Sequence, residues 1–139
     1  MLEFNAPLPR LAGARCSALL AQEFWHAGER VSPANALFLA VEGGAWHRIA
    51  IDCGIVFWRI ETEPSLPGPE MDSDQYGQHP LVDIGAQYGL VGRQIQDVWA
   101  AQQREGDELL IQFENGPVVV LRALRDRDVT DLEIRAPAA

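Results

Sequence analysis

Several short runs of the chain alternate apolar and polar positions. In "LLIQFENG", residues 109–116, the apolar positions 109, 111 and 113 fall on one face and the positions between them fall on the other. This period of two is that of a half-buried β-strand. "LFLAVEGG", residues 37–44, repeats the pattern, and both runs end in a pair, Gly-Gly or Asn-Gly, that tolerates positive φ. The alternation therefore predicts two β-hairpins.

Further strands are predicted at residues 46–51, 55–61, 118–124 and 129–135. The segments that precede the two hairpins, 11–24 and 90–103, are ambiguous. In the second, Val91, Ile95, Val98 and Trp99 have the spacing of an amphipathic helix, but a strand with one bulge produces the same spacing. We expect strands, which makes the fold mainly β, whereas helices would make it α+β.

The two halves of the chain share the order of their features. Each has an L-x-G opening, then an alternating run that ends in an acid and a turn pair, then further strands. We therefore predict one domain over 1–139 with an internal repeat, 11–61 and 90–135, joined by the acidic, Pro- and Gly-rich segment 62–89. The two antiparallel β units are expected to pack as a sandwich or barrel-like domain with pseudo-twofold symmetry. The first copy carries an extra loop, Phe24 to Asn35.

The formal charge of -9 is concentrated in one part of the chain. Between Arg59 and Arg93 there are six acids and no basic residue. Such a field repels phosphate backbones, so we expect no nucleic-acid partner. No apolar stretch is long enough to span a bilayer, and "MLEFNAPLPR" lacks the pattern of a signal peptide. We therefore expect a cytoplasmic protein without a membrane partner.

Common catalytic motifs are missing from the sequence. All 11 basic residues are arginine, which excludes chemistries that need a lysine amine, such as a P-loop or a Schiff base. No serine stands in G-x-S-x-G, and the 3 histidines lack metal-binding spacing. Cys16 and Cys53 form no C-x-x-C pair and are expected to be small buried hydrophobes, although the turn sequence "IDCGI" could expose the sulfur of Cys53. We expect neither enzymatic activity nor a cofactor.

Two surface features are candidate partner-binding sites. Trp46 and Arg48 share one side of a predicted strand, and this mixture is typical of a partner-facing surface, although core packing of the tryptophan is the alternative. Glu70, Asp72 and Asp74 lie in the acidic segment and would attract a basic protein. The alternative for this segment is a solvated loop.

The histidines suggest two weaker interpretations. Asp72, Asp74 and His79 could together hold a divalent cation, although acidic loops are far commoner than metal sites. His47 falls on the side of its strand that carries Ile49, opposite Trp46 and Arg48. We therefore expect it to be a hydrogen-bonded, partly buried histidine.

The L-x-G opening, the apolar triplet after it and the F-E-N-G turn resemble a group of small bacterial domains, several of them immunity proteins that neutralise toxins in interbacterial competition. The resemblance is carried by Leu90, Gly92, Ile95, Val98, Ile111, Phe113, Asn115 and Gly116. All are structural positions, so no functional residue is carried over. The resemblance implies a non-enzymatic protein-binding domain and, within that class, an immunity protein that neutralises a toxin; the acidic segment would make a basic toxin its partner.

Two hypotheses from other classes stay open. A cavity between the two units, with His47, Cys53 or His79 near its mouth, would suit a small-molecule-binding protein or an enzyme. A structural self-association domain, for example a homodimer, is the third hypothesis.

Overall fold

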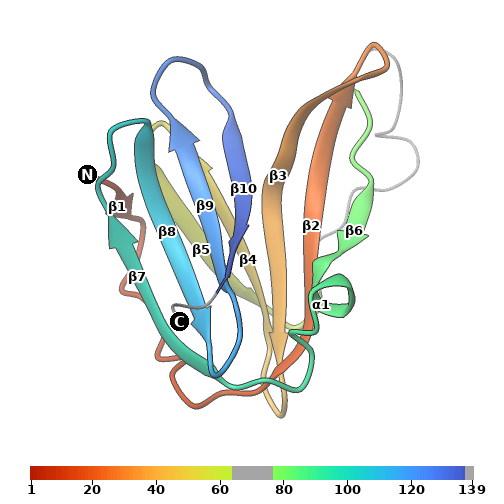
Figure 1. The fold of residues 1–139 in the computed structure, drawn as a ribbon, viewed down its shortest axis with the longest axis vertical. Coiled ribbons are helices and arrows are strands. Elements are labelled where there is room, and N and C mark those ends of the chain that lie inside the picture. The colour runs from red at the N-terminus through yellow and green to blue at the C-terminus, as the bar shows by residue number, and fades with distance from the viewer. Residues whose placement is uncertain (64–76, 137–139) are drawn as a thin grey trace.

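The computed structural model describes residues 1–63 and 77–136 and contains two β-sheets (Figure 1). The elements are β1 (Glu3–Phe4), β2 (Cys16–His26), β3 (Glu29–Val41), β4 (Trp46–Asp52), β5 (Ile55–Glu61), β6 (Leu81–Asp83), α1 (Ile84–Gln87), β7 (Ile95–Ala101), β8 (Gly106–Phe113), β9 (Val118–Leu124) and β10 (Thr130–Arg135). The first sheet has the strand order β1-β5-β4-β3-β2-β6 and the second β10-β9-β8-β7. The fold is mainly β, as predicted, and the sheets do not close into a barrel.

Both ambiguous opening segments form strands, β2 and β7, so the helical alternative is wrong. In each of them the pairing register shifts by one residue at the start of the strand, between Cys16 and Ala18 in β2 and between Ile95 and Asp97 in β7. A bulge between Ile95 and Asp97 brings Ile95 and Val98 to the same face, so a strand with one bulge is the correct interpretation of their spacing.

The two halves have the same strand order, β2-β3-β4-β5 and β7-β8-β9-β10, each an antiparallel meander. Their L-x-G turns are hydrogen-bonded to each other: Gly13 N–H donates to the Ile95 carbonyl and Gly92 N–H to the Cys16 carbonyl, both at 2.8 Å. Because Gly13 corresponds to Gly92 and Cys16 to Ile95, equivalent positions exchange these bonds. The two glycines have φ of 87° and 89°, which a residue with a Cβ rarely adopts. A twofold relation between the whole units stays a prediction.

The hydrophobic core lies between the sheets. Leu37 and Leu39 of β3 and Leu109, Ile111 and Phe113 of β8 are at most 1% exposed, which confirms the inward faces that the alternation predicted. Each side chain of this size stabilises the fold by about 1.5–3 kcal/mol when it leaves water. The two repeated runs therefore hold the sheets together.

The predicted extra loop from Phe24 to Asn35 is wrong. These residues are the outer ends of β2 and β3, joined by a tight turn at Ala27 and Gly28 with φ of 52° and 80°. Figure 1 shows the long β2–β3 hairpin extending beyond the neighbouring strands. The strands were missed because this stretch is polar and contains Pro33, which interrupts the alternation.

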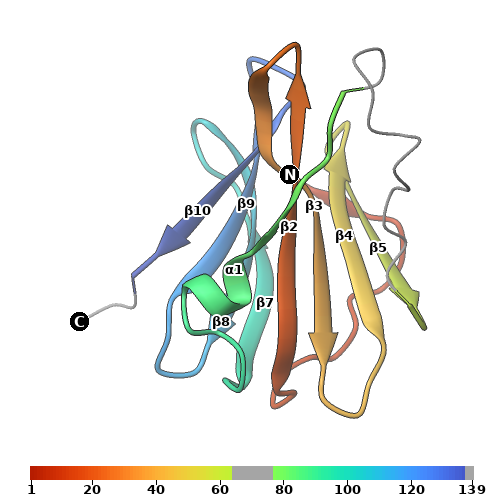
Figure 2. The ribbon, with the colours of Figure 1, turned by 90° about the vertical axis from the view of Figure 1, so that its right-hand side faces the viewer.

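Part of the predicted connection 62–89 also has regular structure. Residues 64–76 lie outside the described ranges, but β6 pairs with β2 and is followed by α1, whose Ile84 is 2% exposed (Figure 2). A strand and a helix this short contain too few residues to show a hydrophobic periodicity in the sequence. In the described part of the chain no helix combines the length and the apolarity needed to cross a membrane.

Candidate functional site

Strands β3 and β4 separate partway along their length. They pair only between the Leu37–Ile49 and Ala40–Trp46 positions, whereas β3 continues to pair with β2 as far as Glu29. The β2–β3 register shifts between the Gln22 and Phe24 positions, and β3 holds extra residues there. A bulge bends its strand and ends regular pairing, so this shift accounts for the separation.

A segment of the second sheet fills part of this gap. The Ser32 hydroxyl donates a 2.7 Å hydrogen bond to the Thr130 carbonyl, and the Thr130 hydroxyl donates to the Ile51 carbonyl at 3.5 Å. Ser32 is 3% exposed and Thr130 is 8% exposed. The beginning of β10 is therefore fixed between the two separated strands.

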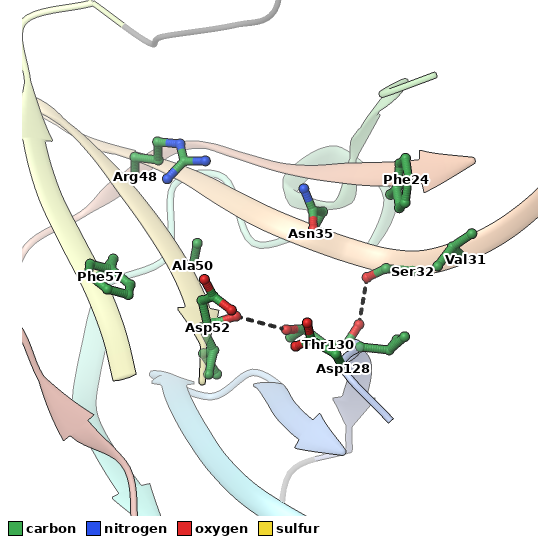
Figure 3. A pocket seen from close by; sticks show the side chains of 12 residues that line it. Phe24, Val31, Ser32, Asn35, Arg48, Ala50, Asp52, Phe57, Asp128 and Thr130 are labelled. Carbon is green, nitrogen blue, oxygen red and sulfur yellow. Dashed lines mark hydrogen bonds between the residues drawn. The ribbon is translucent and has the colours of Figure 1, made fainter. Parts of the chain in front are cut away.

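The remaining space is a cleft of about 410 Å³ (Figure 3). It is lined by Phe24, Val31, Ser32, Asn35, Arg48, Ala50, Ile51, Asp52, Phe57, Asp128, Val129 and Thr130. Both halves of the chain contribute to it, the first through β2 to β5 and the second through the β9–β10 connection. Its volume lies in the range of small-ligand sites.

Trp46 and Arg48, both predicted site residues, lie on the outward face of β4. Both side chains are half-buried, whereas the neighbouring His47 and Ile49 are buried. The predicted alternation of faces along β4 is therefore confirmed. Arg48 lines the cleft and Trp46 does not. Burial, and then the like charge of Arg59 on β5, lower the pKa of the Arg48 guanidinium.

Asp52 and Asp128 place two exposed carboxylates in the same cleft. Asp52 precedes Cys53, whose thiol is exposed in the β4–β5 turn; the expectation of a buried Cys53 is therefore wrong, and the alternative that its turn sequence suggested is correct. A hydrogen bond with Asp52 raises the pKa of this thiol, and the nearby charges of Asp52 and Asp128 add to the effect. Burial raises the pKa of Cys16 to about 11. Both cysteines are therefore mainly thiols at neutral pH, not activated nucleophiles.

His47 faces the core and does not line the cleft. The indole N–H of Trp58 donates to its Nδ1 at 2.9 Å, and burial lowers its pKa. This confirms the expected hydrogen-bonded histidine, which at 5% exposure is more deeply buried than the partial burial expected. The hypothesis that His47 stands at the mouth of a cavity is wrong for this cleft, because the period of β4 turns the imidazole to the opposite face.

The acidic candidates Glu70, Asp72 and Asp74 lie outside the described residues. His79, the third candidate ligand of the predicted metal site, stacks on Phe24 with ring centroids 5.2 Å apart. Phe24 in turn lines the cleft, so His79 lies one side chain away from it. Within residues 1–63 and 77–136 no three histidine, cysteine or acidic side chains form a group that could hold a metal ion.

Sequence reasoning missed most of the cleft. The alternation that selected Trp46 and Arg48 continues to Asp52 on the same face, so this carboxylate could have been found by extending the pattern. Asn35 and Asp128 had no such signal. Asn35 was assigned to a loop, and Asp128 comes near β4 only through the packing of the two sheets.

The fold and the cleft define a two-sheet, mainly β protein with a cleft where two neighbouring strands separate. No protein-family model, curated protein or solved structure matches the chain.

Proposed function

We propose that the chain is a non-enzymatic protein-binding domain, of the immunity-protein kind, that holds its partner on the outward face of β4 and β5 and in the adjoining cleft. One observation carries the proposal: Trp46, Arg48 and Phe57 occupy this single face. Phe57 is 41% exposed, and the other two are half-buried. Aromatic residues and arginine are the residue types enriched in protein interfaces and in their energetic hot spots.

The charge distribution supports a basic partner. The chain has a formal charge of -9, and Glu70, Asp72 and Asp74 follow β5 in sequence, so the acidic segment begins where the proposed face ends. Opposite charge on the partner would speed its encounter with this part of the molecule. A basic toxin is the partner that this reasoning favours.

The experiment is cross-linked capture from the native cell, with identification of the captured protein. Trp46→Ala and Arg48→Ala are compared with the matched controls Tyr88→Ala and Arg104→Ala, which remove an exposed aromatic residue and an exposed arginine from other elements. We expect the wild type and both controls to capture the same basic protein and the two test variants to lose it. Equal capture by all five proteins, or no specific protein at all, contradicts the proposal.

The volume of the cleft favours a second candidate, a small-molecule-binding protein. A cleft of about 410 Å³ with polar groups from both halves has the size and the donor and acceptor groups that a small ligand needs. A ligand that binds only the folded state raises the unfolding temperature, and the increase grows with the logarithm of the ligand concentration once this exceeds Kd. A thermal-shift screen that finds one specific ligand, together with an empty capture experiment, would favour this candidate.

A further inference from the structure

Arg48 lies at one end of the cleft, and among the described residues it donates no hydrogen bond and has no carboxylate within 4 Å; the charge of Glu61 attracts it from a longer distance. In the sheet it stands between Phe38 of β3, which is fully buried, and Arg59 of β5, which has the same charge. Glu61, the acid whose charge acts on Arg48, forms its ion pair with Arg59 at 3.8 Å. A half-buried guanidinium in this setting is stabilised by a carboxylate, which it binds through two parallel N–H···O bonds.

Asn35 adds a neutral donor at the same end of the cleft. It is an exposed residue of the irregular part of β3, and Figure 3 shows its side chain and that of Arg48 projecting into the same space. A side-chain amide can donate to a carboxylate oxygen that the guanidinium leaves open. Arg48 and Asn35 together therefore provide donors suited to one carboxylate.

The opposite end of the cleft has the opposite charge. Asp52 and Asp128 lie there, away from Arg48 in Figure 3. Two carboxylates repel a ligand that carries only negative charge and attract a cationic group. Between Arg48 and Asp52 lies Ala50, and Phe57, its partner on β5, is 41% exposed and offers an apolar ring at the side of the cleft for an aliphatic spacer (Figure 3).

We propose that the cleft binds a bipolar ligand, with its carboxylate on Arg48 and Asn35 and its cationic group on Asp52 and Asp128. The inference rests on the proposed function in that it concerns the same face and cleft. Two sources carry this chemistry: a free amino carboxylate, and neighbouring acidic and basic side chains of a protein partner. The experiment separates them.

The probes are 6-aminohexanoate for the free source and the blocked tripeptide acetyl-Glu-Ala-Lys-amide for the protein source, with acetate and ethylammonium as single-charge controls. Each is titrated into the full chain, and the side-chain Nε–H signal of Arg48, assigned by its loss in Arg48→Lys, is followed by NMR. We expect saturable shifts with at least one bipolar probe and binding about tenfold tighter than that of acetate, because a second charged contact adds about 1.4 kcal/mol.

Variants then test each end of the cleft separately, and binding to them is followed by calorimetry. Arg48→Ala should weaken binding of the bipolar probe about tenfold or more, because it removes a charge-assisted hydrogen bond to the carboxylate. Asp52→Asn with Asp128→Asn should remove the preference for the bipolar probe over acetate. Arg104→Ala, an exposed arginine on the β7–β8 connection, is the matched control and should bind like the wild type. Circular dichroism of each variant establishes that it is folded.

Tighter binding of 6-aminohexanoate than of the tripeptide assigns the free source, and the reverse order assigns the protein source. The inference is overturned if neither bipolar probe saturates, or if binding is the same in Arg48→Ala and in the wild type. This failure is distinct from failure of the proposed function. Partner capture that depends on Trp46 but survives Arg48→Ala supports the protein-binding function and contradicts the carboxylate site. Probe binding without partner capture supports the carboxylate site and contradicts the protein-binding function.

Discussion

Ser32 joins the two sheets at the cleft, and its removal should cost more than its size suggests. Its hydroxyl donates to the Thr130 carbonyl at 2.7 Å and accepts from the Ala34 N–H at 3.2 Å. Ser32 is 3% exposed and Ala34 is 1% exposed, so water cannot easily replace either bond. Ser32→Ala therefore leaves a buried donor and a buried acceptor without their side-chain partner.

The expected loss follows from these two groups. An unsatisfied buried polar group costs about 1–3 kcal/mol, and the Thr130 carbonyl retains a second lone pair, so we expect a loss of about 2 kcal/mol in the free energy of unfolding. In a domain of this size that corresponds to a fall of about 8 °C in Tm. With a urea m-value of about 2 kcal/mol/M, the unfolding midpoint should fall by about 1 M.

The assay is urea unfolding followed by far-UV circular dichroism and by tryptophan fluorescence. Ser17→Ala is the matched control, because Ser17 lies on β2, the strand paired with the β3 strand of Ser32, but its side chain is exposed. We expect the Ser17 variant to unfold close to the wild type. A midpoint for Ser32→Ala no lower than that of Ser17→Ala would refute the reasoning that Ser32 fixes β10 to β3.

Three further predictions concern charge. Glu108 is 1% exposed and accepts a hydrogen bond from Arg122 at 2.6 Å. Arg122→Met leaves this buried carboxylate poorly compensated and should lower the free energy of unfolding by about 3 kcal/mol, and adding Glu108→Leu should recover most of that loss. Urea unfolding of the two single variants and the double variant tests this, and additive losses would contradict it. Burial lowers the pKa of His47 in the folded state below 6.5, so the folded protein favours the neutral imidazole. The contribution of His47 to the free energy of unfolding should therefore be fully present above pH 6.5 and should decrease as the pH falls below 6.5. The His47→Gln variant should lack this decrease, and an identical pH dependence of the urea midpoint in both proteins would count against it. Replacing the three acids within 70–74 by amides should slow association with a basic partner at low salt, as measured by stopped-flow. The effect on the association rate should become small at salt concentrations where the Debye length is below about 10 Å. Equal association rates of the variant and the wild type at low salt would contradict the electrostatic contribution.

The strands that sequence alone predicted well are those whose pattern and turns are local. Residues 55–61 and 118–124 were predicted with the same bounds as β5 and β9. Both runs adjoin turn residues, and apolar side chains recur within each. The β2–β3 ends were missed because Pro33 and the surrounding polar residues hide the alternation. The cleft was out of reach for a different reason: it depends on the bond from Ser32 to Thr130, and those residues are 98 positions apart.

The difference between the two halves explains why a cleft exists on one side of the molecule. In the second half β7 and β8 have 7 and 8 residues, whereas β2 and β3 have 11 and 13. The shared part of each half forms the core and the exchanged hydrogen bonds of the L-x-G turns, which a stable fold needs in both copies. The additional length of β2 and β3 contributes Phe24, Val31, Ser32 and Asn35 to the cleft. The second half forms its own meander without this length, so the additional residues of β2 and β3 are not needed for the meander itself; they fix the start of β10 and line the cleft.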